Sequence, residues 1–339
     1  MSLPVDDHDS VPDPDSEPEV PIDAADEVDS ALGDEDDLLS TSSLTSSVFD
    51  YIQEHGRTYN AYGERTYVLP NDEIELDRLD LQHHLLKMTF NNQLSTCGVE
   101  KKRDLHRVLD IGTGTGIWSV EFGDLHPEAI VLGVDVSPVQ PTYSVPPNVR
   151  FEVMDVGQPW VFSYQFDFIF SRFMTGAVAD WRGFIRQCYE NLAPGAMLEV
   201  QDISFHLACE DGTLPADSAL AKWAAYMLEA SKQLGCPLDS VESVRRIMIE
   251  TGFVDVEETP YIWPMSPWKK DPTLKKIGVW TYHNFTTSLS GISLALFTRG
   301  LAWTADELEA FLIDVRKDMR NTRYHAFWPI YCISGTKPE

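Results

Sequence analysis

The stretch RVLDIGTGTGIWSVEFG, residues 107–123, decides the fold. An apolar run ends at Ile111 and is followed by three glycines in five positions, Gly112, Gly114 and Gly116. Glycines at a strand-to-helix turn let backbone amides approach a ligand at the positive end of the helix dipole. The pattern therefore predicts a strand, a nucleotide-binding turn and a helix, in that order.

Short apolar runs alternate with helical stretches along the rest of the chain. The expected strands are residues 106–112, 129–137, 149–156, 166–173, 194–205, 252–263 and 323–338, and the expected helices cover 115–127, 180–192, 213–234 and 240–250. Most strands are apolar on both faces, as in a parallel sheet that helices cover on both sides. The alternation predicts an α/β fold with an open, doubly wound sheet, and a helical insertion over about 266–318 before the final strand.

A further helix is expected upstream, in NDEIELDRLDLQHHLLKMTFNN, residues 71–92. Asp72 stands where an N-cap would, and Ile74, Leu81, Leu85 and Met88 share one helical stripe. We expect this helix to cover the outside of the fold through that stripe.

The net charge of −28 is unevenly placed, because the first fifty residues hold sixteen acidic residues and no Lys or Arg. A segment so rich in Asp, Glu, Pro and Ser is expected to be disordered. We therefore predict an acidic tail over 1–47, serving as a solubilising segment or a partner-binding arm, and one domain over 48–339. An acidic chain without Lys/Arg runs is poorly suited to nucleic acid.

The five cysteines are scattered, with no CxxC pair, which favours a reducing compartment over a disulfide framework and predicts no metal site. No secretory signal or membrane-spanning run is recognisable, so the expected compartment is the cytoplasm or the nucleus, with no membrane partner. The sequence leaves the oligomeric state open.

Three carboxylates sharpen the identity of the nucleotide. The glycine spacing is GxGxG, and Ile117 stands where the third glycine of a dinucleotide-binding GxGxxG would lie. Asp110, two residues before the first glycine, would repel a pyrophosphate but suits a cationic amine. Asp135 closes the second strand, where an acidic residue accepts ribose hydroxyls, and Asp155 closes the third, where it can accept from an adenine amino group. Together they outline S-adenosylmethionine as the cofactor.

At this point the chain resembles the class I, seven-stranded S-adenosylmethionine-dependent methyltransferases, and within them the fungal LaeA-like group. The resemblance rests on VLDIGTGTGIWSVEF, VLGVDVSPVQP, NVRFEVMDVGQPWVF, FDFIFSRFM, LAPGAMLEVQDI, the upstream HGRTYNAYGERTYVLPND and the terminal RYHAFWPIY, and it covers about residues 48–337. It implies a Rossmann-like sheet of order 3-2-1-4-5-7-6 with the last strand antiparallel.

The resemblance also implies cofactor-binding roles. Asp110, Gly112 and Gly114 would lie at the methionine end, Asp135 at the ribose, and Met154 and Asp155 around the adenine. Ser171 and Arg172 would line the cofactor mouth, and Tyr59 would act as a lid residue. The complete expected set is Tyr59, Asp110, Gly112, Gly114, Gly116, Asp135, Val136, Met154, Asp155, Val156, Ser171 and Arg172.

The methyl acceptor is less constrained by the sequence. Methyl transfer is an in-line displacement, and a general base is needed only if the acceptor is protonated at neutral pH. Asp202, after the fifth strand, is a candidate to orient a substrate, and His283, in the helical insertion, is the preferred acid or base. A cap or turn role for Asp202 stays open.

Four functions are weighed. The first is methyl transfer to a small-molecule acceptor, such as a secondary metabolite, favoured by the aromatic helical insertion. The second is a LaeA-like regulator that acts through protein partners or protein methylation, favoured by the acidic tail and the resemblance. Ile117 and Asp110 disfavour a dinucleotide-dependent oxidoreductase, and the intact glycines and carboxylates disfavour a scaffold that has lost its cofactor.

Overall fold

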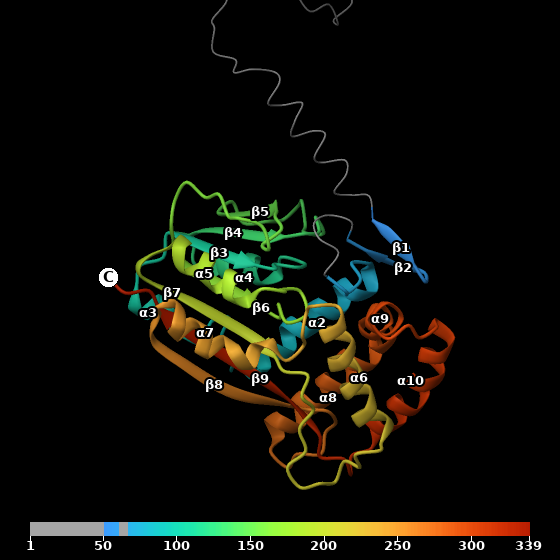
Figure 1. Cartoon of the computed structure of the whole chain (residues 1–339). Helices are drawn as coiled ribbons and strands as arrows, with labels where there is room; N and C mark the ends of the chain where they lie inside the picture. The colour runs from blue at the N-terminus through green and yellow to red at the C-terminus, as the bar shows by residue number, and fades with distance from the viewer. Residues whose placement is uncertain (1–50, 61–66) are drawn as a thin grey trace, which may run out of the picture. The chain divides into compact units, whose positions relative to one another are not determined.

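Seven strands form one mixed sheet in the computed structural model, which describes residues 51–60 and 67–339. They are β3 (Arg107–Ile111), β4 (Ile130–Asp135), β5 (Val149–Val153), β6 (Phe166–Arg172), β7 (Leu192–Ile203), β8 (Val254–Pro264) and β9 (Phe327–Thr336). Their order is β5-β4-β3-β6-β7-β9-β8 (Figure 1). Neighbours from β5 to β7 pair in parallel, and β9 runs antiparallel to both β7 and β8. The expected fold class, strand order and antiparallel last strand are confirmed.

Nine α-helices, two short helical turns and a hairpin accompany the sheet in the described part of the chain. The helices are α2 (Glu73–Thr89), α3 (Val99–Lys102), α4 (Ile117–Leu125), α5 (Trp181–Asn191), α6 (Ala219–Gln233), α7 (Val244–Thr251), α8 (Pro272–Thr287), α9 (Leu289–Ala295) and α10 (Ala305–Arg320). A short 3-10 turn η1 (Ser240–Ser243) precedes α7, and a π-helical turn η2 (Leu296–Gly300) continues α9. The helical insertion before the last strand thus comprises α8, α9, η2 and α10.

The two faces of the sheet are covered by different helices because side chains alternate along each strand. In β3, Val108 packs on one face with Trp118 of α4, whereas Leu109 packs on the other with Phe184 of α5. Phe170 of β6 stacks on Trp118 with ring centroids 4.0 Å apart. This two-sided burial explains why the central strands are largely apolar on both faces.

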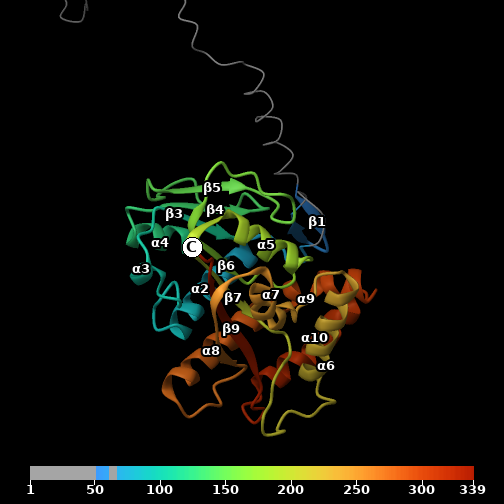
Figure 2. The same cartoon turned by 60° about the vertical axis from the view of Figure 1, so that its left-hand side comes forward.

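A third core lies beyond the sheet, where α6, α9 and α10 lie side by side in both views (Figures 1 and 2). Trp223 of α6, Phe285 of α8 and Trp328 of β9 are all buried there, and Phe285 stacks on Trp328. Helix α8 also packs against α2 and β8. We call α6, α8, α9, η2 and α10 the helical cap.

Helix α2 begins as expected but buries a different face. The Asp72 side chain accepts a hydrogen bond from the Glu75 amide, so the N-cap is confirmed. Ile74, expected on the buried stripe, is 53% exposed, whereas Glu75 and Arg78 are buried as a salt-bridged pair. These charges can be buried because each is the partner of the other and because Asn284 of α8 also bonds to Arg78. Helix α2 therefore lies inside the fold, and the expectation that it covers the outside is wrong.

The upstream block contains a hairpin that the sequence did not predict, β1 (Ile52–Glu54) with β2 (Arg57–Tyr59). Arg299 of η2 binds Glu54 at 2.7 Å and so ties the hairpin to the cap. The predicted tail and its boundary at residues 47 and 48 lie outside the described residues. Within residues 51–60 and 67–339, no helix is long and apolar enough to span a bilayer, and no cluster of three metal-ligating side chains occurs.

Candidate functional site

The turn between β3 and α4 keeps its backbone open for a ligand. Gly112, Gly114 and Gly116 have φ values of +68°, +56° and +79°, a region that glycine adopts without a steric penalty. A Cβ atom on Gly112 would stand 2.2 Å from Sδ of Met174, and one on Gly116 would meet the Phe151 ring at 2.6 Å. Both positions need glycine for their φ, and a side chain at 116 would also collide with the Phe151 ring, whereas at 112 the Met174 side chain would have to move.

A cavity of about 550 Å³ opens beside this turn, at the carboxyl ends of β4, β5 and β6. We call it the large cavity. Its walls include Asn60, Tyr67, Leu79, Gln82, His83, Gly112, Thr113, Gly114, Thr115, Asp135, Val136, Met154, Asp155, Val156, Arg172, Phe173 and Met174. Ligands of open α/β sheets bind at this edge of the sheet, so the cavity is the candidate nucleotide site.

Asp135, at the end of β4, is held firmly at the cavity wall. Its two carboxylate oxygens accept from the backbone amides of Gly114 and Ser137, each at 2.9 Å. Burial raises the pKa of Asp135, and the backbone amides oppose this shift. The carboxylate thus links β4 to the glycine turn and stays at the same edge as the ligand.

The end of β5 forms the neighbouring wall. The amide of Met154 donates to the carbonyl of Asp135 at 2.9 Å, which brings Met154 beside β4. Asp155 accepts from the amide of Gly157 at 2.9 Å in a tight turn. Met154, Asp155 and Val156, which the sequence analysis expects to bind the cofactor, all line the large cavity.

Arg172, at the end of β6, faces the large cavity and bonds to α2. Its Nη2 atom lies 3.1 Å from Nδ1 of His83, whose Nε2 atom lies 3.2 Å from Glu121. Burial lowers the pKa of Arg172 to about 10 and, together with the charge of Arg172, lowers the pKa of His83 to about 3. His83 is therefore neutral and accepts from Arg172, so it links α2 to β6.

Four of the predicted cofactor residues stand behind the cavity wall. Asp110 is buried and accepts hydroxyl hydrogen bonds from Thr113 at 2.6 Å and Ser119 at 2.7 Å, and burial raises its pKa. Ser171 and Gly116 are buried beside it in the sheet and the turn. These residues shape the turn, and none of them lines the large cavity.

Tyr59 is the fourth, and the structure does not support a lid position for it. Its ring is buried, with the Arg299 guanidinium 4.8 Å from the ring centroid. It lines neither the large cavity nor the smaller cavity beside it. Its neighbour Asn60 and the later Tyr67, from the same upstream block, line the large cavity instead. In an extended strand alternate residues face opposite sides, and this places Asn60 on the cavity side.

The two predicted catalytic residues are placed differently from each other, and neither lines the large cavity or the smaller one beside it. His283 is exposed on α8 beside Tyr282, so the structure does not bring it to the site. Asp202, at the end of β7, is fully buried and accepts from the amides of Thr175 and Ile203, both at 2.8 Å. Burial raises the pKa of Asp202 to about 7. The carboxyl fixes the loop that follows β6.

A smaller cavity of about 80 Å³ adjoins the large one under the helical cap, and we call it the small cavity. Tyr67, Leu79, Gln82 and Phe173 line both cavities. The other walls of the small cavity come from Val68, Leu69, Arg78, Thr175, Gly176, Ile203, Phe205, Met227, Leu238, Asn284, Phe285, Ile292 and Leu296. It is a mainly apolar space directly beside the nucleotide site.

Sequence reasoning missed Tyr67, Gln82 and His83 at the large cavity and Arg78 and Asn284 at the small one. Four of the five lie on the helices α2 and α8. One signal was available for α2, where Glu75, Arg78 and Gln82 follow at spacings of three and four and so share a helical face.

The residues of the large cavity fit a cationic nucleoside better than a pyrophosphate. Its titratable walls include the acidic Asp135, Asp155, Asp180 and Glu190 and the basic Arg172 and Arg186. No lysine is among the described residues that line it, and the glycine turn leaves open backbone beside the carboxylate of Asp135. The fold and this cavity define the class of Rossmann-like methyltransferases that use S-adenosylmethionine.

Comparisons with known proteins give the family. A family model described as a methyltransferase domain matches residues 82–258. Methyltransferase pytC of Aspergillus terreus is 39% identical over 300 residues, which cover 88% of this chain and 92% of the relative. Probable methyltransferase tdiE of Emericella nidulans is 31% identical over 299 residues, covering 88% and 92%. Secondary metabolism regulator laeA of Aspergillus fumigatus is 31% identical over 306 residues, covering 89% and 80%.

The chain belongs to this methyltransferase family, together with these fungal relatives. It is an enzyme that transfers a methyl group from S-adenosylmethionine. The resemblance read from the glycine turn and the strand ends is confirmed.

Proposed function

We propose that this enzyme methylates a small-molecule acceptor, held in the small cavity beside a donor held in the large one. The observation that carries the proposal is the junction of the two cavities, where Tyr67, Gln82 and Phe173 line both. An acceptor in the small cavity would meet the donor inside the protein. The name of the 39% identical relative, a methyltransferase, agrees with an enzymatic role.

We assign the donor's parts to residues at the large cavity. Asp135 would hold the ribose, Met154, Asp155 and Val156 would surround the adenine, and Gly112 and Gly114 would lie against the methionine part. Asp110 and Ser171 would act indirectly, through the shape of the turn. When bound, S-adenosylmethionine supplies a methyl group on a positively charged sulfur.

The chain's own contribution is positioning and exclusion of water. In the transfer, the acceptor's nucleophilic atom bonds to the methyl carbon, the carbon–sulfur bond breaks, and a proton leaves an acceptor that carried one. Among the described residues that line the small cavity there is no carboxylate or imidazole, and burial raises the pKa of Tyr67, so the phenol is a poor base. We therefore assign the rate enhancement to orientation, which can supply several kcal/mol.

Calorimetry tests the donor site directly. We expect S-adenosylmethionine to bind the full chain with micromolar affinity, NAD to give no heat, and Asp135→Ala to weaken binding at least tenfold. Binding of NAD alone would overturn the proposal. Formation of S-adenosylhomocysteine is then measured with a protein-free metabolite extract and, separately, with a dialysed protein fraction, and we expect turnover with the first.

A regulator acting through protein partners is the second candidate. Its support is the 31% identity to a secondary metabolism regulator together with the acidic first fifty residues. Turnover with the protein fraction alone would favour this candidate. Under this second candidate the chain would act on proteins in the cytoplasm or the nucleus.

A further inference from the structure

The polar end of the small cavity is built on a buried ion pair. Glu75 and Arg78 of α2 are 0% and 7% exposed, and Nη2 of Arg78 lies 2.6 Å from Oε1 of Glu75. Burying two charges costs free energy that such a pair only partly regains, so a buried pair needs a further reason. Here the reason is that the remaining N–H donors of Arg78 bind two side-chain amides of the cavity wall.

Arg78 fixes the orientation of two side-chain amides that line the small cavity. Its Nη1 atom donates to Oε1 of Gln82 at 2.5 Å and to Oδ1 of Asn284 at 3.3 Å. A guanidinium has only donors, so both amides must turn their oxygens toward it. The NH₂ groups of Gln82 and Asn284 are then the ends left to bind a ligand, and an NH₂ group binds an oxygen acceptor.

The cavity carries no net charge at this end, because Glu75 neutralises Arg78. A carboxylate or an ammonium ion on the ligand would bring an uncompensated charge into an apolar space, at a large desolvation cost. A neutral carbonyl oxygen matches two N–H donors without that cost.

Apart from Tyr67 and Thr175, the other walls are apolar, and several of them are fixed in place. Phe173 stacks on Trp263 with ring centroids 5.5 Å apart, and Phe205 and Phe285 stand among the apolar walls. Leu238 is held by its amide, which donates to Ser231 at 3.1 Å, and by its carbonyl, which accepts from Phe205 at 3.0 Å. A wall held in this way favours an apolar body of matching size.

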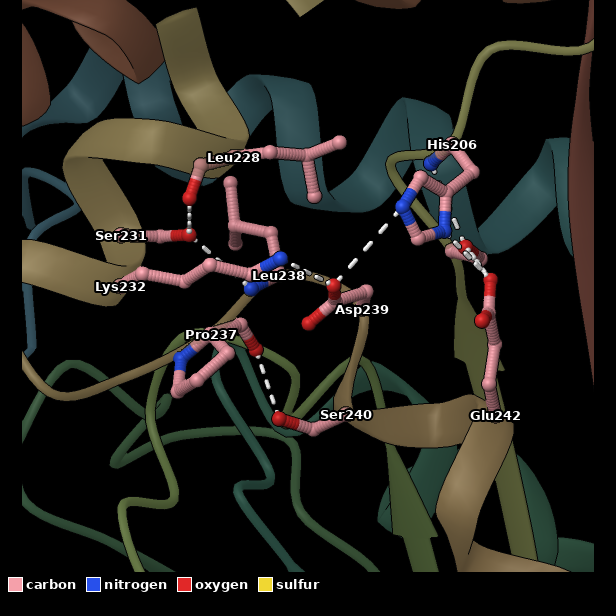
Figure 3. Close-up of polar contacts among 10 residues, drawn as sticks. His206, Leu228, Ser231, Lys232, Pro237, Leu238, Asp239, Ser240 and Glu242 are labelled. Carbon is pink, nitrogen blue, oxygen red and sulfur yellow. Dashed lines mark hydrogen bonds and ion pairs between the residues drawn. The ribbon is translucent and has the colours of Figure 1, made fainter. Parts of the chain in front are cut away.

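The segment that carries Leu238 is braced from both sides, as Figure 3 shows. Lys232 binds Asp239 at 2.8 Å, and Ser240 donates to the carbonyl of Pro237 at 2.7 Å. His206 stands between Glu242, at 2.7 Å, and Asp239, at 3.8 Å. The wall of the small cavity is thus part of the scaffold, so the cavity exists before a ligand arrives.

We propose that the methyl acceptor is a neutral, mainly apolar molecule whose carbonyl oxygen is bound by the side-chain N–H groups of Gln82 and Asn284. Because Gln82 lines both cavities, the carbonyl lies at their junction, toward the methyl donor, and the apolar body lies against the phenylalanines. This inference rests on the proposed small-molecule function and names the class of its substrate.

The test compares three probes of similar size on the full chain saturated with S-adenosylhomocysteine: acetophenone, its hydrocarbon analogue α-methylstyrene, and benzoate. Binding is measured by ligand-observed NMR titration. We expect acetophenone to bind at least tenfold more tightly than either of the others. Equal binding of the ketone and the hydrocarbon, or tightest binding of benzoate, would overturn the proposal.

Two variants locate the contact. Gln82→Glu and Asn284→Asp keep an oxygen for Arg78 but replace the NH₂ group by an oxygen, so each should remove most of the ketone preference. Thr281→Val, on the same helix as Asn284 but outside both cavities, should keep it. A ketone preference that survives in both acidic variants would show that the carbonyl binds elsewhere.

Failure of this inference is separable from failure of the proposed function. S-adenosylhomocysteine binding is measured first by calorimetry on every variant. If the nucleotide binds but no ketone preference appears, the substrate class is wrong and the donor site stands. If the nucleotide does not bind the unmodified chain, the proposed function itself falls.

Discussion

At Gly114 the backbone has a positive φ of +56°, but the space beside it is open, since the nearest atom to an added Cβ would be Leu79 Cδ1 at 3.4 Å. We expect Gly114→Arg to fill the large cavity and lower S-adenosylmethionine affinity at least a hundredfold. Gly114→Ala carries the same backbone strain, about 1 kcal/mol, without the bulk, and should stay within tenfold of the unmodified chain. Calorimetry and thermal unfolding separate the two effects, and equal affinities would remove Gly114 from the site.

Asp202 gives a pH dependence of a definite sign. Its pKa is about 7 in the folded chain against an ordinary 3.8, so between these values the folded state holds more protons than the unfolded one. The free energy of unfolding contributed by this group therefore falls as pH rises from 4 to 7 and is constant above that. The stability of the unmodified chain relative to Asp202→Asn should drop by about 3 kcal/mol between pH 4.5 and 7.5.

Urea unfolding at the two pH values measures that difference. A difference that does not change with pH would mean that Asp202 does not titrate in this range. Asn loses part of the geometry, because its NH₂ group must face one of the two backbone amides, so the variant is expected to be less stable at pH 4.5.

At the scale of single residues, the strand ends were predictable and the side-chain directions were not. Asp135 and Asp155 could be placed at one sheet edge because parallel strands end together. Tyr59 and His283 could not be assigned a direction, since a one-residue shift in a strand, or 100° on a helix, changes the face. The structure turns both of them away from the cavities.

At the scale of elements, His83 joins α2 to β6 and α4. The groups that face it are Arg172, Glu121 and Lys87, and its pKa of about 3 keeps it neutral in the folded state. The unfolded state binds a proton below pH 6.5, so the free energy of unfolding falls as pH drops from 6.5 toward 3. The side-chain oxygen of Gln in His83→Gln can still accept a hydrogen bond from Arg172. Between pH 7 and pH 5 the free energy of unfolding of this variant should fall by about 2 kcal/mol less than that of the unmodified chain.

The neighbouring His84 is exposed and provides the control for that measurement. His84→Gln should follow the unmodified chain at both pH values in urea unfolding. If the His83 and His84 variants behave alike, the link between α2 and β6 does not depend on a neutral imidazole.

The elements themselves were largely predictable, and the exception is instructive. All seven strands of the large sheet were found, because two-sided burial leaves an apolar run with turn residues at its ends. The buried face of α2 was missed because the apolar stripe through Ile74 was expected to be the buried one, whereas Glu75 and Arg78 are buried. Their burial depends on mutual pairing and on Asn284, 206 residues away, which no local pattern records.

At the scale of the whole chain, the sheet order followed from the family resemblance and agrees with general rules for crossovers. Neither the resemblance nor the crossover rules predicted the small cavity. Its walls include residues of the segment before α2, α2 itself, the loop after β6, β7, α6, α8, α9 and η2, and its shape depends on how the cap packs. An acceptor site of this kind depends on tertiary packing, so the acceptor class could be addressed only from the structure.

The last prediction is that the acidic tail is not needed for catalysis and contributes only to partner binding. The described residues that line the two cavities begin at Asn60 and Tyr67, so a chain that starts at residue 48 retains every one of them. We expect its S-adenosylmethionine affinity and its turnover of small molecules to match those of the full chain within threefold. Its net charge is less negative by more than half, so partners attracted by charge should be lost.

Parallel pull-downs from one lysate, with the full chain and with the shortened chain, provide the measurement. Partners captured by both would assign them to the folded domain, whereas partners lost on shortening, with turnover unchanged, would give the tail a separate binding role. Loss of turnover in a shortened chain that still folds would contradict the assignment of catalysis to the two cavities. A single truncation therefore separates partner binding that depends on the tail from enzymatic activity that depends on the two cavities.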